Sequence, residues 1–214
     1  KGCTPNESNA IDYRRSQGHY LKDHVDDRKL SKEPIANLSL AGDCYMTFRN
    51  VKGTGHAVKV LLKRRCLQIL TGKSRYDYSH GIEHGHLSSE RRISVTMRES
   101  PLTIPKTTTT AAALQHSSSN VALSVKLPQS ITEKTADCLQ PIPGLYIFLD
   151  FITVDEEAEI LRHIDHCSPD WRFERHTGSH REKRWGMDHD LWNSQVVRSP
   201  KHELPHFCRT ILFP

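Results

Sequence analysis

Short apolar segments separated by turn-forming residues fill most of residues 34–98, and this pattern limits the folds that the chain can adopt. Each segment is about five residues long, the usual length of a β-strand, and several adjoin a glycine. In one of them, Cys44, Met46 and Phe48 alternate with tyrosine and threonine, which gives a half-buried strand two different faces. The segments are residues 35–41, 44–48, 57–62, 66–70, 75–80 and 93–97. They predict an antiparallel β-sandwich or barrel.

The beginning and the middle of the chain have other compositions. Residues 1–33 are polar and charged, and they predict loops with a short strand. Residues 101–140 contain TTTT, AAA and SSS runs with several prolines, which is typical of a flexible linker, although residues 121–127 alternate like a strand. We therefore expect a first folded part in residues 1–100, a linker in residues 101–140, and a second folded part in residues 141–214.

The second folded part begins with a helix signal. Residues 145–151 form an apolar, strand-like run, and Thr153 followed by Glu156 predicts a capping box at a helix N-terminus. Acidic residues fill the first turn, where the helix dipole favours them. Residues 168–203 are polar and basic and predict long loops or a ribbon, and residues 207–213 predict the start of another helix. The expected buried stripe of the first helix consists of Ile160, Leu161 and Ile164.

Composition and cysteine usage argue against several classes of protein. No apolar run is long enough to cross a bilayer and no signal peptide opens the chain, so we expect a soluble, intracellular protein without a membrane partner. The six cysteines include no CxxC pair, which argues against a zinc ribbon or a disulfide framework and favours a reducing compartment. The net charge of +5 permits an anionic partner such as nucleic acid but does not require one.

A His-x-Asp triplet at His24 and Asp26 is the first candidate for chemistry. On extended backbone, side chains two residues apart leave the same face, so the two can bind one metal ion together. Two histidines and one carboxylate on one side of Fe(II) leave the other coordination positions open for a co-substrate and O₂. A second copy at His163 and Asp165 lies in a segment of helical period, where residues two apart point to nearly opposite sides.

The third metal ligand should lie at a strand end tens of residues further on. His80 fits, because an apolar and aromatic segment stops there at Gly81. His84 and His86 are rivals, but they lie in a polar gap with nothing to hold them. We therefore expect His24, Asp26 and His80 to form the metal site.

Two arginines follow in the next apolar segment. Arg92 and Arg98 are an even number of residues apart, so both guanidinium groups lie on one face of the expected strand over residues 93–97. Two such groups suit a dicarboxylate, because the planar guanidinium fork can pair with both oxygens of a carboxylate. Together with the metal pattern, they indicate 2-oxoglutarate as a co-substrate.

These pieces, in this order, resemble the AlkB family of Fe(II)/2-oxoglutarate dioxygenases. The resemblance implies a mainly β fold with flanking helices, a double-stranded β-helix or jelly roll. The family's usual Asn residues two before the cofactor-binding tyrosine and two after the first arginine are Ile11 and Ser94 here, which makes cofactor affinity less certain than metal binding. The matching segments are residues 24–26, 34–40, 74–76, 80–82 and 92–98. The implied roles are Fe(II) ligands for His24, Asp26 and His80, and 2-oxoglutarate contacts for Arg92, Arg98 and Tyr13.

The second folded part resembles the beginning of the same family. Residues 143–152 and the capped helix look like its N-terminal strand and helix, and residues 180–186 look like its substrate-side segment. Since these pieces normally precede the iron motif, we expect one domain assembled from two segments in circularly permuted order. The alternative is a fragment that holds the end of one copy and the start of another. The implied substrate contacts are Arg181, Lys183, Arg184 and Trp185.

Within the family, the spacing from Tyr13 to His24 and the His-x-Asp-Asp form look most like the AlkB homologue 4 branch. That resemblance implies oxidative N-demethylation of a methylated nucleic-acid base or of methyl-lysine, with release of formaldehyde, succinate and CO₂, in the nucleus or the cytoplasm. Two other functions remain open: a hydroxylase that acts on a protein side chain with the same fold, and a nucleic-acid or protein binding module without turnover. Metal binding and formaldehyde release discriminate between them.

Overall fold

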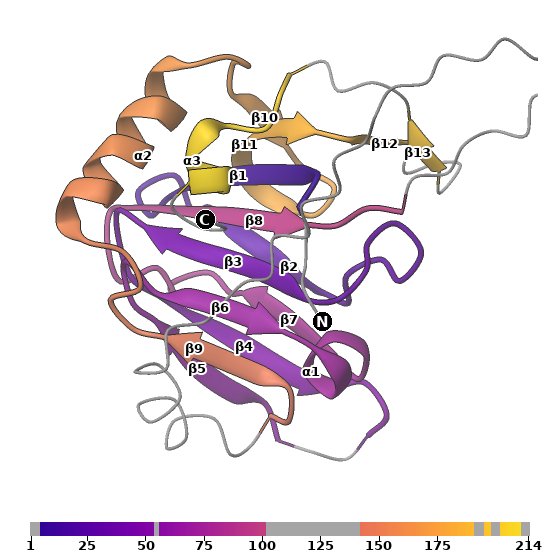
Figure 1. The fold of residues 1–214 in the computed structure, drawn as a ribbon. Helices are drawn as coiled ribbons and strands as arrows, with labels where there is room; N and C mark the ends of the chain where they lie inside the picture. Colours follow the sequence, from indigo (N-terminus) through magenta and orange to yellow (C-terminus); the bar gives the residue numbers. More distant parts are fainter. Residues whose placement is uncertain (1–4, 54–55, 102–141, 191–194, 198–201, 211–214) are drawn as a thin grey trace, which may run out of the picture.

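An antiparallel sheet of 11 strands dominates the computed structural model, which describes residues 5–53, 56–101, 142–190, 195–197 and 202–210 (Figure 1). The order of the strands is β5-β4-β7-β2-β11-β1-β8-β3-β6-β9, and β10 pairs with β11. The strands are β1 (Glu7–Arg14), β2 (Tyr20–His24), β3 (Ile35–Leu40), β4 (Cys44–Asn50), β5 (Val58–Leu62), β6 (Leu67–Leu70), β7 (Tyr78–Ile82), β8 (Arg91–Arg98), β9 (Leu145–Phe148), β10 (Arg172–Glu174) and β11 (Gly178–Gly186). A separate pair consists of β12 (Asp188–Asp190) and β13 (Gln195–Val197), and the helices are α1 (Gly72–Tyr76), α2 (Val154–His166) and α3 (His206–Thr210).

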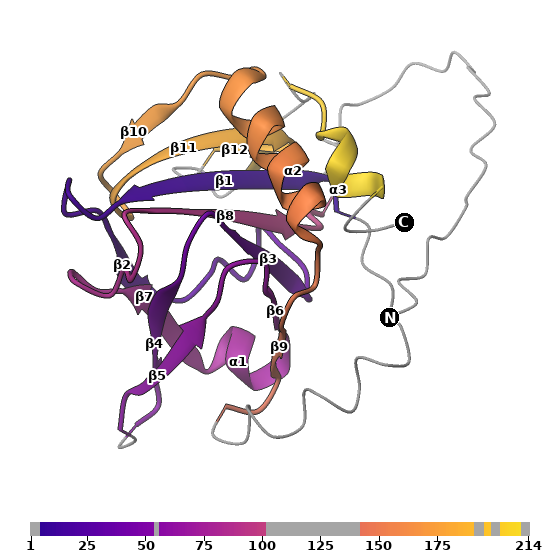
Figure 2. The same ribbon diagram turned by 90° about the vertical axis from the view of Figure 1, so that its left-hand side faces the viewer.

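Strand β11 joins the two layers of this sheet. One end of it pairs with β1, from Gly186 opposite Glu7 onward, and the other end pairs Gly178 with Leu21 of β2. The layer β1-β8-β3-β6-β9 therefore continues through β11 into the layer β2-β7-β4-β5, and the two enclose an interior (Figures 1 and 2). This nearly closed antiparallel arrangement is the expected jelly roll.

Both parts of the chain contribute strands to this one sheet. From the second part, β9 pairs with β6, with Leu145 opposite Leu70, and β11 pairs with β1. The loop before β9 also holds α1, because Pro143 accepts a hydrogen bond from the backbone N–H of Ser74 at 2.9 Å. The expected linker over residues 101–140 and the expected strand over residues 121–127 lie outside the described residues, apart from Pro101. The permuted order of the domain stays a prediction.

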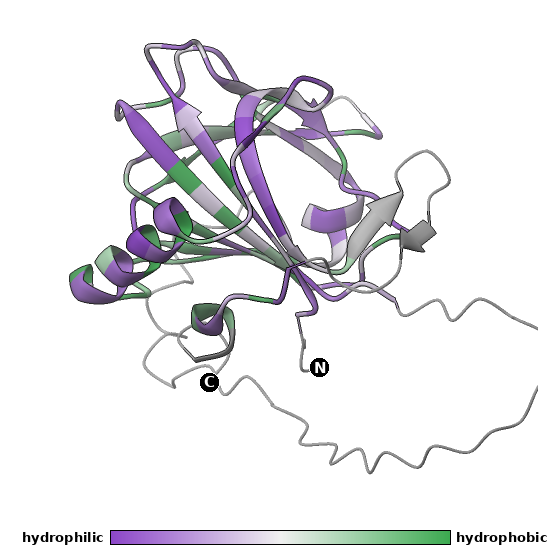
Figure 3. Ribbon diagram, turned by 90° about the horizontal axis from the view of Figure 1, so that it is seen from above, coloured by the Kyte–Doolittle hydropathy of each residue, from purple (hydrophilic) through white to green (hydrophobic). Residues whose placement is uncertain are grey.

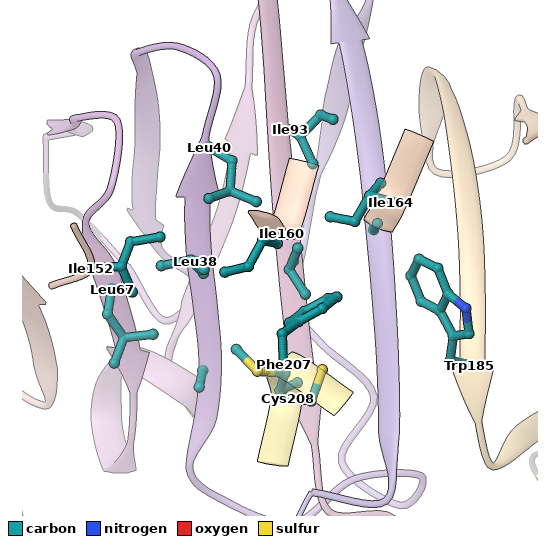
Figure 4. Packing of buried hydrophobic residues seen from close by; sticks show 14 of the residues in the cluster. Leu38, Leu40, Leu67, Ile93, Ile152, Ile160, Ile164, Trp185, Phe207 and Cys208 are labelled. Atoms are coloured by element: carbon teal, nitrogen blue, oxygen red, sulfur yellow. The ribbon is translucent and has the colours of Figure 1, made fainter. Parts of the chain in front are cut away.

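Side chains of β8 alternate between two buried environments, as the period of a strand requires. Ile93, Val95 and Met97 face α2 and α3, and the residues between them face the interior. Each fully buried aliphatic side chain of this kind contributes about 1.5–3 kcal/mol. The core below the helices (Figure 4) consists of Ala10, Ala36, Leu38, Leu40, Leu67, Ile93, Val95, Met97, Phe148, Ile152, Ile160, Ile164, Trp185, Phe207 and Cys208.

A second core fills part of the interior between the two layers. It brings residues of β4 and β5 against residues of β3, β6 and β9, so it holds the layers together beside the polar part of the interior. Its members are Tyr13, Ile35, Cys44, Met46, Phe48, Leu62, Cys66, Leu70, Ile82, Leu87, Ile142, Leu145 and Ile147.

Helix α2 begins with the capping box that the sequence predicts. The backbone N–H of Glu156 donates to Thr153 Oγ1 at 3.2 Å, and Glu156 Oε2 accepts from the backbone N–H of Thr153 at 2.7 Å. Ile160 and Ile164 are fully buried, and Leu161 packs at the edge of the same core. The helix carries hydrophobic and hydrophilic residues (Figure 3), as expected for one that covers a sheet. Among the described residues, no helix has the length and apolar character needed to cross a membrane.

Three expectations about local structure differ from what is observed. Residues 75–80 were expected to form one strand, but Thr71 and Ser74 start the short helix α1, and the strand begins only at Tyr78. The polar region of residues 1–33 contains the eight-residue strand β1, and the region of residues 168–203 contains the nine-residue strand β11. Both strands were hidden because many of their inward-facing side chains are polar and line a cavity, so they lack an apolar alternation.

Candidate metal centre and co-substrate pocket

His24, Asp26 and His80 come together at one end of the interior. The pairing of β2 with β7 sets His24 directly opposite His80, and Asp26 follows two residues after the end of β2. Potential ligand atoms of the three side chains all lie within 4.8 Å of one another. His24 Nε2 is 3.8 Å from Asp26 Oδ1, and His80 Nε2 is 3.6 Å from Asp26 Oδ2. Two imidazoles and one carboxylate in this arrangement suit Fe(II).

The protonation states at neutral pH are those that a metal requires. Burial lowers the pKa of His80 to about 4, so its ring is neutral. Burial alone would raise the pKa of Asp26, but His80, which is protonated in acid, and the guanidinium of Arg98 more than offset this, so the pKa is about 2. A neutral imidazole and an ionised carboxylate can both donate a lone pair to a cation.

A backbone carbonyl fixes the orientation of the first histidine. His24 Nδ1 lies 2.8 Å from the carbonyl oxygen of Lys22. Because a carbonyl only accepts hydrogen bonds, Nδ1 carries a proton, and Nε2, the nitrogen on the Asp26 side, is the atom available to a metal. Such a partner holds both the tautomer and the angle of a ligating ring.

The three side chains line a cavity of about 210 Å³ in the interior. The far side of this cavity is formed by the inward face of β1, β8 and β3, and most residues that line the cavity are polar. Glu182 and Arg184 of β11 also line it. Polar side chains on the sheet side include Asn9, Asn37, Gln68, Ser94 and Thr96.

Arg92 is the buried cation of this cavity. Only 1% of its surface is exposed, and one terminal nitrogen donates to Ser39 Oγ at 2.9 Å. Its guanidinium carbon lies 5.5 Å from the centre of the Tyr13 ring. The other two nitrogens, Nε and Nη1, have no hydrogen-bond partner among the described residues. A buried cation with free donors is costly, and a carboxylate of a bound ligand would supply an acceptor and a compensating charge.

Arg98 and Tyr13 take different positions in the same cavity. Arg98 contacts Glu7 Oε1 at 3.1 Å and Asp26 Oδ1 at 3.4 Å, so it already interacts with protein carboxylates. Burial raises the pKa of Tyr13, so its hydroxyl stays protonated and can donate a hydrogen bond. Both side chains line the cavity that also contains Arg92 and the metal group.

The two departures from the family pattern face each other. Ile11 of β1 is paired with Ser94 of β8, and both residues line the cavity. Ile11 and Ser94 therefore change the shape and polarity of the cavity wall at the same point. This pairing was not visible in the sequence, because it depends on the register of two strands far apart in the chain.

The rival histidines lie outside the metal group. His84 stacks on the Tyr20 ring with 4.2 Å between ring centres, and His86 Nε2 is 3.7 Å from Glu83. The second His-x-Asp copy lies on α2, as expected, where His163 contacts the Phe207 ring and Asp165 pairs with Arg91.

Of the four residues expected to contact substrate, the structure brings only Arg184 to the cavity. Arg181 pairs with the buried carboxylate of Asp12 on the side of the sheet that α2 covers. Lys183 and Trp185 also face that side: Lys183 Nζ donates to the carbonyls of Ile164 and Cys167 at 2.7 and 2.9 Å, and Trp185 Nε1 donates to the carbonyl of Ser168 at 2.8 Å. The side chains alternate along β11, so neighbours in the basic run must face opposite sides.

Replacing Lys183 with methionine tests this placement. We expect the free energy of unfolding to fall by about 2 kcal/mol, because two carbonyls at the end of α2 lose a charged donor. Turnover of 2-oxoglutarate should be unchanged. Chemical denaturation and a succinate assay measure the two quantities, and a large loss of turnover in a fully folded variant would contradict the placement.

Sequence reasoning missed several residues of the cavity wall. Glu182 accepts hydrogen bonds from Arg184 Nε at 2.9 Å and from Asn9 Nδ2 at 3.4 Å. Asn9 lies two and four residues before Ile11 and Tyr13, so strand alternation around Tyr13 would have identified it if β1 had been recognised. Arg75 belongs to a segment that matched the family, but no role was assigned to it.

Comparison with known proteins agrees with this geometry. Residues 3–98 match the model of the 2OG-Fe(II) oxygenase superfamily. The match covers slightly less than half of the chain but includes all the residues expected to bind metal and co-substrate. It supports an Fe(II)- and 2-oxoglutarate-dependent dioxygenase.

Curated relatives carry AlkB homologue names. The chain is 37% identical over 78 residues to the tRNA (carboxymethyluridine(34)-5-O)-methyltransferase ALKBH8 of Macaca fascicularis, covering 36% of this chain and 11% of the relative. It is 37% identical over 90 residues to the mitochondrial alpha-ketoglutarate-dependent dioxygenase alkB homolog 7 of Bos taurus, covering 38% of this chain and 41% of the relative. The matched region is thus less than half of either relative. The assignment to the AlkB homologue 4 branch stays a prediction.

Proposed function

We propose that this chain is an Fe(II)/2-oxoglutarate-dependent dioxygenase that removes N-methyl groups from a methylated nucleic-acid base or from methyl-lysine. One observation carries the proposal: buried Arg92, which has two nitrogens without a hydrogen-bond partner among the described residues, lines the same cavity as the His24, Asp26 and His80 cluster. A carboxylate anchor and a metal site with open positions are what a chelating keto acid requires.

Each residue has a distinct task in this proposal. His24, Asp26 and His80 hold Fe(II) on one side, and Arg92 pairs with the distal carboxylate of 2-oxoglutarate. Tyr13 donates a hydrogen bond from its protonated hydroxyl, and Arg98 keeps Asp26 ionised. When bound, the iron and 2-oxoglutarate supply, with O₂, the oxidising power to hydroxylate an N-methyl carbon, after which formaldehyde, succinate and CO₂ leave.

The chain's own contribution is to bind, orient and exclude water. The protein positions the co-substrate through fixed donors on rigid strands, which avoids the entropic cost of finding the productive orientation. The buried cavity limits access of water to the reacting atoms. Arg184, half-exposed at the cavity wall, is the residue that we propose meets the substrate.

The names of the relatives support the proposed dioxygenase reaction more strongly than they support the identity of the substrate. The name of alkB homolog 7 states an alpha-ketoglutarate-dependent dioxygenase, which agrees with the proposed reaction. The name of ALKBH8 states an action on tRNA, which favours a nucleic-acid substrate, but the match covers only 11% of that protein. A methylated nucleic acid and a methylated protein therefore both belong in the first assays.

The test is a coupled measurement of two products. The purified chain with Fe(II), 2-oxoglutarate and ascorbate is incubated with methylated oligonucleotides or with methyl-lysine peptides. We expect formaldehyde and succinate in equal amounts with the correct substrate. Succinate and a hydroxylated product without formaldehyde would instead indicate a side-chain hydroxylase. Metal binding without any succinate would contradict the proposal and favour a binding module.

A further inference from the structure

Arg75 of α1 is a fully buried arginine whose hydrogen bonds all reach residues 26–31, which begin with the last residue of the His-x-Asp triplet. Its Nη1 donates to the backbone carbonyl of Asp26 at 2.8 Å. Its Nη2 donates to the carbonyl of Asp27 at 2.5 Å and to Ser31 Oγ at 3.1 Å. One side chain thus fixes both ends of the turn over residues 26–31.

The choice of acceptors is unusual for a buried cation. Buried charges are usually paired with an opposite charge, because removal from water is costly. The hydrogen-bond acceptors of Arg75 are two backbone carbonyls and a hydroxyl, and its guanidinium carbon lies 5.2 Å from the centre of the Tyr76 ring. A planar fork with several donors can hold separate carbonyls in one fixed arrangement, which a shorter or apolar side chain cannot do.

The held turn belongs to the cavity wall. Asp27, Leu30 and Ser31 line the cavity together with Asp26. Asp27 Oδ1 closes the turn locally by accepting from the backbone N–H groups of Lys29 and Leu30 at 2.6 and 2.8 Å. Side-chain contacts also reach it from the fold: Arg28 donates to the carbonyl of Tyr76, and Arg98 donates to Asp26 Oδ1. Arg75 adds the hydrogen bonds that hold the backbone carbonyls of Asp26 and Asp27.

Helix α1 also leads directly into the strand that carries the third ligand. Arg75 lies five residues before His80, and only Tyr76 and Asp77 separate it from β7. The hydrogen bond from Arg75 to the Asp26 carbonyl therefore connects the backbone of one metal ligand to the segment that carries another. A shift of this arginine would change the distance between the two ligands.

We propose that Arg75 is a positioning residue for the metal centre, which sets the backbone of Asp26 relative to His80 without contacting the metal. The proposal rests on the proposed metal site and goes beyond it, since it concerns a residue outside the coordination sphere. Residues that orient metal ligands typically change metal affinity by about 10- to 100-fold when they are replaced.

The experiment measures binding of Co(II) alone to the intact chain, followed by its visible absorption. Arg75→Met should raise the dissociation constant for Co(II) about 10- to 100-fold and alter the shape of the spectrum, because the ligand geometry changes. Arg75→Lys, which keeps the charge but offers one donor group instead of a fork, should fall between the parent and the methionine variant. Arg91→Met is the matched control, because Arg91 pairs with Asp12 and Asp165 on the helix-covered side. It should lower thermal stability and leave Co(II) affinity unchanged.

The outcomes separate this inference from the proposed function. If the parent bound no Co(II), or if His80→Ala bound it equally well, the metal site itself would be wrong. If the parent bound Co(II) and folded Arg75→Met bound it with the same dissociation constant and spectrum, only the role of Arg75 would be overturned. Should Arg75→Met not fold, Arg75→Lys decides in the same way. Failure of both variants to fold would overturn the inference too, since Arg75 would then determine folding rather than ligand placement.

Discussion

Replacing His80 with alanine is expected to lower 2-oxoglutarate turnover by roughly a thousandfold or more, or about 4 kcal/mol in activation free energy. His80 supplies one of three ligands in a cluster whose ligand atoms lie within 4.8 Å, and among the described residues no other group of this kind is found. Its neutral state, due to the low pKa that burial causes, makes it ready to bind a cation. Loss of one ligand from three leaves a weak two-point chelate. Succinate formation with Fe(II) and binding of Co(II) measure the two consequences.

His84→Ala is the control for that variant. His84 lies four residues further on, but it stacks on Tyr20 and is not part of the metal group. We expect it to keep turnover and Co(II) binding within about twofold of the parent, well below the tenfold that 1.4 kcal/mol would produce. Equal losses in both variants would show that the region around β7 tolerates no change, and would remove the support for His80 as a specific ligand.

The His24, Asp26 and His80 group could be predicted from sequence because each member has a local signal. His24 and Asp26 are two residues apart on extended backbone, and His80 lies in a short apolar segment next to Gly81. The expected strand end at Gly81 is not observed, because β7 continues to Ile82. Pairing of β2 with β7 then places His24 opposite His80. The apolar segments between residues 35 and 97 were recognised for the same reason, since a strand with one apolar face has a visible period of two.

The polar residues that face the cavity could not be predicted from the sequence. Asn9 and Glu182 are buried and line the cavity. The sequence around them is polar, so it resembles that of a solvent-exposed loop. The basic run of β11 shows the same limit: Lys183 is buried and donates to carbonyls at the end of α2, partners that only the folded chain supplies. Polar residues with tertiary partners leave no periodic signal, so such positions require the register of the sheet.

Replacing Arg92 with methionine is expected to raise the 2-oxoglutarate concentration for half-maximal turnover by roughly 150-fold, or about 3 kcal/mol, because the ligand carboxylate would lose a buried, charge-assisted partner. Co(II) binding should be unchanged, since Arg92 is not in the metal group. The unliganded protein should not lose stability, because two of the three guanidinium nitrogens have no hydrogen-bond partner among the described residues and removal of the charge relieves its burial cost.

Arg91→Met distinguishes a binding role of Arg92 from a structural one. The two arginines are adjacent on β8 but face opposite sides, and Arg91 holds Asp12 and Asp165 at 3.1 and 2.5 Å. Its replacement should therefore lower the free energy of unfolding and leave the half-saturating concentration of 2-oxoglutarate unchanged, the reverse of what is expected for Arg92. Titration of turnover against 2-oxoglutarate, with chemical denaturation of the unliganded variants, measures both. If Arg92→Met instead lost stability and kept its half-saturating concentration, the free nitrogens would have a structural role, and the cavity would have to bind the co-substrate through another cation such as Arg98.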